Sequence, residues 1–389
     1  MRLRLLVAAL LAVAAACTPE RGTSPAPTEP SFSVTPAAAR YIVVFRDNVG
    51  SADVPGLARA MSQAHGSVPD FVYQHALRGF AAVLSHRAAA ALEADPRVRY
   101  VEPDQVMEAV AQSLPWGIDR IDADVSSTLA GNGSGAVTNV NVYIIDTGID
   151  RNHPDLNVVE HVNFAGGPNK DCNGHGTHVS GTVAAKDDAQ GVVGVVPGAP
   201  LHGVKVLGCG GSGSTSGVIA GVDWVTQHAT KPAVANMSLG GGASTALDDA
   251  VRNSAVSGVV YALAAGNSGA DACNSSPARA GAGTNNGIIT LSAIDQGDNE
   301  ASFSNYGTCV DMAAPGVSIL STYKGGAYAT LSGTSMASPH AAGTAALYLS
   351  SHPTASPGSV EAQMKLDNGG LSKNSKDGSG DPIVSAGKY

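Results

Sequence analysis

The sequence predicts an α/β fold in which a parallel β-sheet is covered by helices on both faces, preceded by a smaller α+β domain. Two observations carry this prediction. Between residues 140 and 265, short and nearly continuous apolar runs recur, and helical stretches separate the later ones; strands buried on both faces have this composition. Before them, residues 41–101 read as strands and helices in the order βαββαβ.

The first residues read as an export signal. Arg2 and Arg4 precede the apolar residues 5–16, a run too short to cross a membrane. Small residues then lead into Cys17, as in the lipobox of bacterial lipoproteins, whose Cys carries lipid. The alternative is ordinary signal cleavage nearby, which leaves Cys17 as an unused thiol. We expect a signal at residues 1–16 and a Pro- and Ser-rich linker at residues 17–39.

Residues 40–110 predict the small domain. The β-branched and aromatic runs predict strands, and Pro96 ends the second helix. This order is a ferredoxin-like split βαβ unit, which by itself implies no activity. Strands are expected at residues 41–45, 71–73, 80–84 and 98–101, and helices at residues 54–65 and 86–94.

The remaining residues, 111–389, predict the larger domain. Ligands of such sheets bind at the carboxyl ends of the strands, so polar residues there are functional candidates. Strands are expected at residues 140–145, 201–207, 233–239 and 259–265, and helices at residues 216–228 and 244–257.

Composition and charge exclude several functional classes. The chain is 43% hydrophobic and 14% charged, which argues against disorder. Its net charge of −9 falls entirely within residues 111–389, where there is no basic run, so nucleic acid is not an expected partner. No apolar stretch reaches the length of a membrane span.

Three segments carry residues suited to nucleophilic catalysis. Asp146 follows an apolar strand, His175 lies between two glycines, and Ser335 precedes an Ala-rich helix. A Ser hydroxyl needs an imidazole to take its proton, and the imidazole needs a carboxylate to orient it. We expect Pro339 to lie in the first helical turn and leave the Ser335 amide free. His175 and His178 could instead form a zinc pair, but the Glu of a metalloprotease helix is missing.

With Asp, His and Ser in this chain order, residues 111 to about 370 resemble the subtilisin superfamily, in its proteinase K and aqualysin-like branch. Residues 235–241 and 264–267 extend the match. Residues 41–108 resemble the inhibitor-like propeptide of those enzymes. The resemblance implies a three-layer α/β/α sheet and a serine endopeptidase. It implies Asp146, His175 and Ser335 as the catalytic triad, with Asn267 and the Ser335 amide as oxyanion donors.

The same resemblance implies where a peptide substrate binds. The substrate would lie as an added strand between two backbone edges. A pocket of small, uncharged residues would receive the side chain before the cleaved bond, which favours broad cleavage after apolar or aromatic residues. The two edges are Gly211, Ser212 and Gly213, and Ser238, Leu239 and Gly240, and the pocket is Ala264, Ala265 and Gly266.

Four cysteines remain after Cys17, and they allow three pairings. The resemblance favours Cys172–Cys209 and Cys273–Cys309. Disulfides fit an exported protein, because they persist in oxidising compartments.

Calcium is the cofactor that the resemblance implies, and no organic cofactor is expected. Relatives place a calcium carboxylate at Asp311, and Asp119 and Asp122 match a second site; carboxylates are suitable hard ligands. Ala123 and the insertion at residues 280–287 depart from the family pattern. The alternative for Asp119 and Asp122 is that they are solvated surface carboxylates.

The resemblance also predicts processing. Residues 104–110 would occupy the active cleft, and cleavage between Val110 and Ala111 would release a mature, monomeric enzyme. A lipid on Cys17 would then anchor the propeptide and leave the enzyme free to be secreted. The propeptide would act as an intramolecular inhibitor, and proteins and peptides would be the substrates. Two alternatives remain: a binding protein with an inactive cleft, and an esterase with the same triad.

Overall fold

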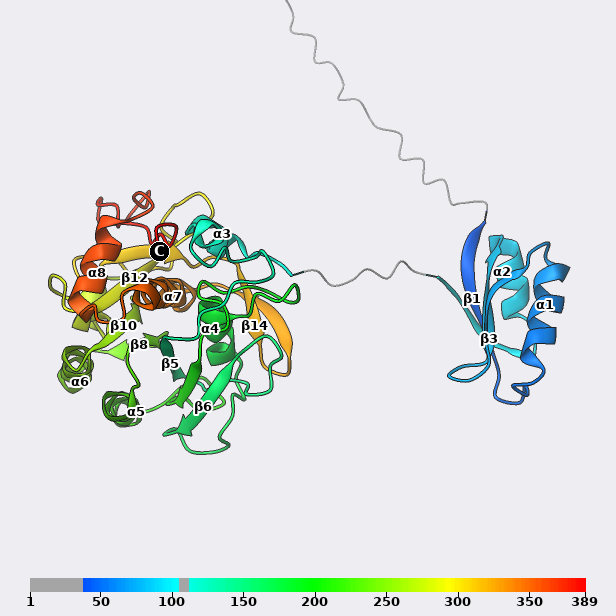
Figure 1. Ribbon diagram of the computed structural model, residues 1–389, viewed down its shortest axis with the longest axis horizontal. Helices are drawn as coiled ribbons and strands as arrows, with labels where there is room; N and C mark the ends of the chain where they lie inside the picture. Colours follow the sequence, from blue (N-terminus) through cyan, green and yellow to red (C-terminus); the bar gives the residue numbers. More distant parts are fainter. Residues whose placement is uncertain (1–37, 105–111) are drawn as a thin grey trace, which may run out of the picture. The chain divides into compact units, whose positions relative to one another are not determined.

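The computed structural model describes residues 38–104 and 112–389, which form two compact units (Figure 1). The expected signal at residues 1–16, Cys17, most of the linker and the Val110–Ala111 junction lie outside the described residues. No helix in the described part of the chain is long and apolar enough to cross a membrane.

The first unit is the predicted βαββαβ domain. Its antiparallel sheet has the order β2-β3-β1-β4, and both helices pack on one face through the apolar cluster that includes Val43, Phe80 and Leu92. The opposite face exposes Phe71, Val83 and Tyr100. The elements are β1 (Ala39–Phe45), α1 (Val54–Ala64), β2 (Pro69–Tyr73), β3 (Gly79–Leu84), α2 (His86–Glu93) and β4 (Val98–Pro103).

The second unit confirms the predicted fold class. A seven-stranded parallel sheet has the order β13-β12-β10-β8-β5-β7-β6. Apolar residues fill both faces of its strands, which explains their continuous apolar runs. The strands are β5 (Asn141–Asp146), β6 (Val158–Asn163), β7 (Leu201–Lys205), β8 (Ala233–Met237), β10 (Val259–Ala264), β12 (Ile288–Ile294) and β13 (Met312–Pro315).

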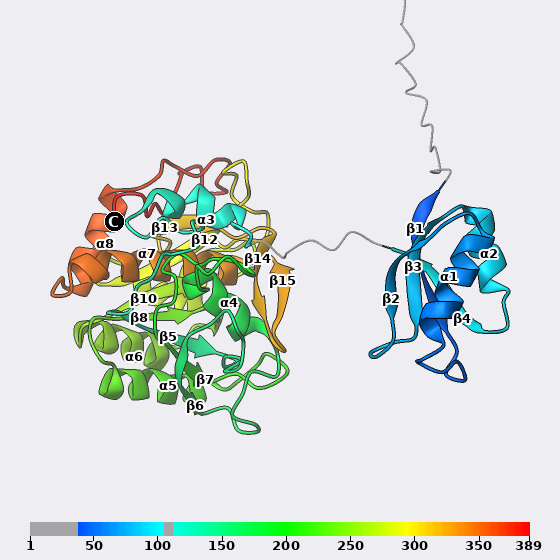
Figure 2. The ribbon, with the colours of Figure 1, turned by 45° about the vertical axis from the view of Figure 1, so that its right-hand side comes forward.

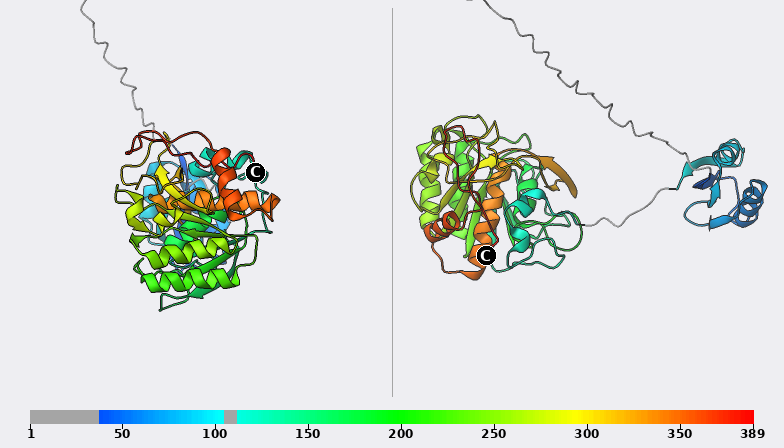
Figure 3. Two further views of the ribbon diagram at one scale, coloured as in Figure 1. Left: turned by 90° about the vertical axis from the view of Figure 1, so that its left-hand side faces the viewer. Right: turned by 90° about the horizontal axis from the view of Figure 1, so that it is seen from above.

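Helices cover both faces of this sheet (Figures 1 and 2). On one face, α4 (His175–Ala184), α7 (Thr334–Ser351) and α8 (Pro357–Leu366) bury their apolar residues against the strands. On the other face, α5 (Thr215–His228) and α6 (Thr245–Val256) lie side by side (Figure 3).

Short elements complete the unit. The hairpin of β14 and β15 packs near α4, and β9 pairs with β11. The C-terminal residues also pack on the domain: Ile383 bridges Ala313 and is fully buried. These elements are α3 (Trp116–Arg120), β9 (Gly241–Gly242), β11 (Ser275–Ser276), β14 (Ile319–Tyr323), β15 (Ala327–Leu331) and three 3₁₀ turns at Ala123–Val125, Ala272–Asn274 and Ala278–Gly281.

The sequence located four strands of the large sheet and the helices α5 and α6, but it left β6, β12, β13, α4 and α8 unassigned. The start of α7 also requires a correction. The helix begins at Thr334, so Pro339 lies in its second turn and not in its first.

Candidate active site

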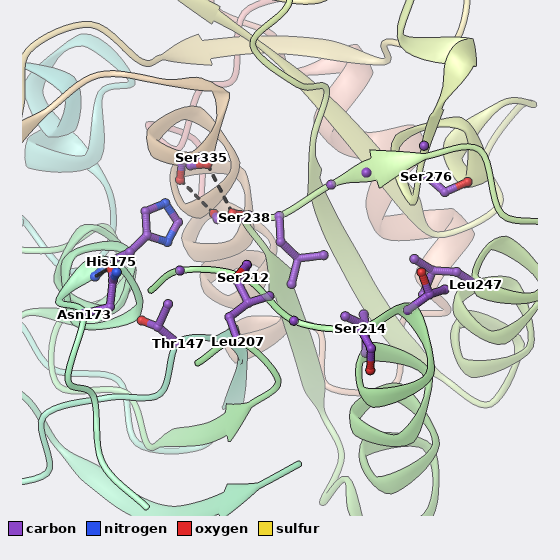
Figure 4. Close-up of a pocket in the computed structure, with 18 residues that line it drawn as sticks. Thr147, Asn173, His175, Leu207, Ser212, Ser214, Ser238, Leu247, Ser276 and Ser335 are labelled. Carbon is purple, nitrogen blue, oxygen red and sulfur yellow. Dashed lines mark hydrogen bonds between the residues drawn. The ribbon is translucent and has the colours of Figure 1, made fainter. Parts of the chain in front are cut away.

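The candidate catalytic residues meet at the carboxyl edge of the parallel sheet. Asp146 is the last residue of β5, His175 the first of α4, and Ser335 the second of α7. Asn267 follows the end of β10. His175 and Ser335 line the same pocket (Figure 4).

Asp146 and His175 form a close pair. The His175 Nδ1 atom lies 2.8 Å from Asp146 Oδ1 and 3.0 Å from Oδ2, and the carboxylate is fully buried. Burial lowers the pKa of His175, but the charge and hydrogen bond of Asp146, together with the charge of Asp171, outweigh it and raise the pKa overall. The carboxylate therefore orients the ring and favours its protonated form.

Ser335 is joined to Ser238 by two reciprocal hydrogen bonds (Figure 4). Its hydroxyl donates to the Ser238 carbonyl at 3.1 Å, and the Ser238 hydroxyl donates to the Ser335 carbonyl at 2.7 Å. Pro339 explains the second bond. In a helix the N–H of residue 339 would donate to the Ser335 carbonyl, but proline has no N–H, so this carbonyl is free to accept from Ser238. The Ser335 amide is free for a different reason: the first amides of a helix have no partner within it.

Asn267 presents its amide nitrogen beside this helix end. Its Oδ1 accepts from the Thr334 amide at 2.8 Å and from the Thr334 hydroxyl at 2.9 Å, so the side-chain NH₂ group remains as a donor. A Cβ built on Gly333 would lie 3.3 Å from Asn267 Nδ2 and 3.6 Å from the Ser335 nitrogen. The two donors thus flank one small space that the glycine leaves open, the arrangement that stabilises an oxyanion.

Two pockets adjoin this centre and contain the sequence-predicted substrate residues. One, of about 400 Å³, is lined by both expected backbone edges and by Leu207, Val218 and Leu247. The other, of about 370 Å³, includes Asn267 and Ser335 in its lining. The small residues of this second pocket include Ala264, Ala265 and Gly266.

Asp171 is a site residue that sequence reasoning missed. Its buried carboxylate accepts hydrogen bonds from the amides of Asn173, Gly174 and Thr177 and from the hydroxyls of Thr147 and Thr177, at 2.6–3.0 Å. It therefore accepts hydrogen bonds from backbone amides at the amino-terminal end of α4, which have no partner within the helix. His175 is the first residue of this helix. The sequence does contain one indication of this role: Asp171 lies shortly before a segment rich in Gly, Thr and His, which are weak helix formers, and an Asp near a helix start often caps it.

The cysteines pair as Cys172–Cys209 and Cys273–Cys309, the pairing that the resemblance implies. The first bridge joins the segment before His175 to the segment before Gly211. Asn173 Nδ2 adds a hydrogen bond to the Cys209 carbonyl at 3.1 Å. The segment of His175 and one expected substrate edge are therefore tied together covalently.

A zinc role for His178 does not fit its surroundings. Its Nε2 lies 3.0 Å from the carbonyls of Ile319 and Ala329, and burial lowers its pKa to about 4. The ring therefore joins α4 to the β14–β15 hairpin.

Asp311 does not fit the expected role of calcium ligand. Its Oδ1 lies 2.8 Å from Lys365 Nζ, and its Oδ2 accepts from the Thr290 amide at 2.9 Å. Lys365 also lies 2.6 Å from the fully buried Glu361 carboxylate. Because α8 carries Lys365 to this position, its ammonium occupies the Asp311 oxygen that a calcium ion would need.

In the described part of the chain, no third acidic side chain lies with Asp119 and Asp122 to complete a calcium site. Asp119 is exposed, and Asp122 Oδ2 accepts from the Ser385 hydroxyl at 2.9 Å. Among residues 38–104 and 112–389, no three His, Cys, Asp or Glu residues are grouped to hold a metal ion.

Asp155 and Gln112, which sequence reasoning did not single out, carry buried oxygen atoms that lack a partner among the described residues. Asp155 Oδ1 and Gln112 Oε1 are buried without a hydrogen-bond partner in the described chain. The Gln112 amide nitrogen contacts the carbonyls of Lys186 and Val192, at 2.8 and 3.3 Å, and the Val192 amide donates to Asp155 Oδ2 at 3.1 Å. Carboxylate, amide and carbonyl oxygens are the ligands that Ca²⁺ prefers.

Comparison with known proteins supplies the family context. Residues 138–380 match the subtilase family, and residues 40–109 match the peptidase inhibitor I9 family. An extracellular serine proteinase of Thermus sp. (strain Rt41A) is 44% identical over 388 residues, which cover 91% of both chains. An alkaline serine exoprotease A of Vibrio alginolyticus is 44% identical over 84% of this chain and 63% of its own.

A solved structure is also similar to this chain. The crystal structure of a cold-adapted subtilisin-like serine proteinase matches with a TM-score of 0.62 and 44% sequence identity. The match covers 70% of this chain and 97% of that chain.

Replacing Lys365 with Met tests the ion-pair assignment at Asp311. Removing one partner of a buried pair typically costs about 3–5 kcal/mol, so we expect a loss of this order in the free energy of unfolding at pH 8. Burial raises the pKa of Asp311 to about 7, so its protonation should reduce the loss at pH 5. Urea unfolding at both pH values measures the difference.

The control for this variant is Lys373→Met, which removes an exposed lysine that pairs with Asp298 at 3.4 Å. Surface pairs contribute little, so it should change stability by less than about 1 kcal/mol. Equal losses in the two variants, or a Lys365→Met loss independent of pH, would contradict the assignment.

Proposed function

This chain belongs to the subtilase family of serine proteinases, and we propose that it is a secreted, self-processing endopeptidase with the triad Asp146, His175 and Ser335. The observation that carries the proposal is the site itself. A buried carboxylate holds the imidazole at 2.8 Å, and a Ser on a helix amino terminus lines the same pocket.

The proposed reaction begins when His175 Nε2 takes the proton of the Ser335 hydroxyl and Oγ bonds to the scissile carbonyl carbon. The hydroxyl first leaves its hydrogen bond to the Ser238 carbonyl. The oxyanion forms between Asn267 Nδ2 and the Ser335 amide. His175 then protonates the leaving amine, which gives an acyl-enzyme. A water, deprotonated by His175, attacks this ester and releases the acid, and Ser335 regains its proton.

The proposed specificity is broad, with apolar or aromatic side chains before the cleaved bond. Its support is a pocket of small, neutral residues at Ala264, Ala265 and Gly266. The backbone edges at residues 211–213 and 238–240 would hold the peptide as an added strand. Leu207, Val218 and Leu247 would bind a further apolar side chain of the substrate.

We propose the precursor organisation expected from the sequence: a signal at residues 1–16, a linker at residues 17–39, an inhibitor domain at residues 40–110 and a catalytic domain at residues 111–389. Self-cleavage between Val110 and Ala111 would release a monomeric enzyme, and a lipid on Cys17 would anchor only the propeptide. The inhibitor I9 match supports the inhibitory role.

Subtilisins generally bind calcium, and we propose that Asp155, Gln112 and the carbonyls of Lys186 and Val192 hold it in this chain. The unpartnered Asp155 and Gln112 oxygens support this choice. Burial raises the pKa of Asp155 to about 6, and a bound cation would favour its ionised form. The ion would stabilise the fold and take no part in the proton transfers.

Replacing Ser335 with Ala tests the nucleophile and the self-processing together. We expect wild-type protein expressed from residue 18 to separate into two fragments split at Val110–Ala111, while the Ser335→Ala protein stays whole, because the acyl-enzyme cannot form. Intact mass spectrometry of both proteins measures this. If both are cut alike, self-processing is refuted. If both stay whole, a casein digest distinguishes an active enzyme processed by another protease from an inactive cleft.

Replacing Asn267 with Leu tests the oxyanion role. Loss of one such donor typically lowers turnover about 10²–10³-fold, so we expect kcat to fall by this factor with KM nearly unchanged. Steady-state kinetics on a peptide substrate measure both constants. Thr334→Val is the control, because it removes the hydroxyl that donates to Asn267 Oδ1 and accepts from the Gly266 amide, and leaves the Asn267 donor. A kcat within tenfold of wild type for Asn267→Leu would rule out the role.

Replacing Asp155 with Asn tests the calcium proposal. In the inactive Ser335→Ala protein, calcium at 100 times its Kd should add about 2.7 kcal/mol to the free energy of unfolding, and Asp155→Asn should remove most of this gain. Urea unfolding with calcium or with EDTA measures it. Asp119→Asn is the control and should keep the full response. A response lost in Asp119→Asn and kept in Asp155→Asn would place the ion at the other site.

A further inference from the structure

A fully buried lysine lies beside the Asp146–His175 pair. Lys205 ends β7 and is paired in register with Asp146 at the end of β5. It has no exposed surface. Its Nζ donates to the carbonyls of Thr147 at 2.6 Å and Leu207 at 2.9 Å and lies 3.9 Å from Cys172 Sγ. Within the described chain its hydrogen-bond partners are thus all neutral. Burying an ammonium among neutral partners costs free energy unless nearby carboxylates compensate its charge.

Thr147 connects this lysine to both halves of the catalytic pair. Its carbonyl accepts from Lys205, and its amide donates to Asp146 Oδ1 at 2.6 Å. Its hydroxyl donates to Asp171 Oδ1 at 3.0 Å and accepts from the Gly176 amide at 2.9 Å. Every polar atom of Thr147 is therefore used, and the network runs from the strand of Asp146 to the helix of His175.

The network contains two buried carboxylates and one ammonium. Asp146 and Asp171 are both buried, as is Lys205. With a neutral His175 the group carries one net negative charge, and with a protonated His175 it is neutral. Its charge is therefore balanced when the imidazole has taken the Ser335 proton, which is the state that the reaction must stabilise.

We propose that Lys205 and Asp171 are positioning residues whose opposite charges, joined through Thr147, set how readily His175 holds a proton during catalysis. The inference rests on the proposed triad. The directions of the pKa shifts agree with the part assigned to Asp171. Burial lowers the pKa of Lys205 overall, while Asp171 and Asp146 raise it; Asp171 also raises the pKa of His175.

Other ionisable groups near His175 do not reproduce this arrangement. His178 and His161 have pKa values lowered chiefly by burial, which favours their neutral forms, and Lys324 is exposed to solvent screening. On the elements packed around His175, further ionisable groups include Asp146 at the end of β5, Asp150 in the segment after this strand and Tyr323 on β14. The Tyr323 hydroxyl donates to the Asn173 carbonyl.

The experiment compares Lys205→Met and Asp171→Asn through the pH dependence of kcat/KM on a peptide substrate. Removing the positive charge should favour the imidazolium, so the ratio of kcat/KM at pH 6 to that at pH 8 should fall about threefold. Removing the negative charge should raise this ratio about threefold. Each change corresponds to about half a pKa unit. A purely structural role lowers kcat/KM at both pH values and leaves the ratio unchanged.

Three further variants make the outcome decisive. Lys324→Met removes a neighbouring exposed lysine and should leave the ratio unchanged. The double variant Lys205→Met/Asp171→Asn should return the ratio toward wild type. Ser335→Ala, assayed first, must be inactive; activity in that variant refutes the triad and not the charge balance. Ratios that move in the same direction in both single variants, or in neither, overturn the inference.

If Lys205→Met does not fold, Asp171→Asn alone decides, and an unchanged or lower ratio overturns the inference. If wild-type protein is inactive, NMR titration of His175 measures the same shifts directly. Its pKa should rise in Lys205→Met and fall in Asp171→Asn.

Discussion

The buried carboxylate of Asp146 is the constraint around which the rest of the site is arranged. A charge without solvent contact needs hydrogen-bond donors, and the Thr147 amide and His175 Nδ1 supply them. The parallel sheet makes this possible, because it places the end of β5 beside the ends of β7 and β8. His175 in turn is held by α4, whose amino-terminal end depends on Asp171. The geometry of the Asp146–His175 pair is thus a property of the sheet edge as a whole.

Sequence reasoning proposed the candidate site from residue type, order and context. The buried strands were recognisable where apolar runs were long, as before Asp146, and glycine neighbours marked His175. It missed α4 because Gly, Thr and His are weak helix formers, and the helix depends on Asp171, which lies outside it. It misplaced Pro339 because the start of α7 is fixed by a tertiary contact, the bonds from Thr334 to Asn267.

Contacts between residues distant in sequence could not be predicted either, because they too depend on tertiary packing. Lys365 meets Asp311 only because α8 packs beside β12, and Lys205 meets Thr147 only because β7 lies next to β5. A single sequence carries no local signal for either contact. The calcium role expected for Asp311 came from the family pattern, whereas the Lys365 ammonium that pairs with this carboxylate lies on a later helix.

The ion pair at Asp311 has a consequence for how this region responds to its surroundings. A dissolved ion leaves its site when its concentration falls, by mass action. The Lys365 ammonium is covalently part of the chain, so its local concentration is fixed by the fold and cannot be diluted. The ion pairs that it makes with Glu361 on α8 and with Asp311 after β12 are therefore independent of the mineral content of the medium. What can remove this cation is chemistry on the amine itself, such as acylation, or a pH high enough to deprotonate it.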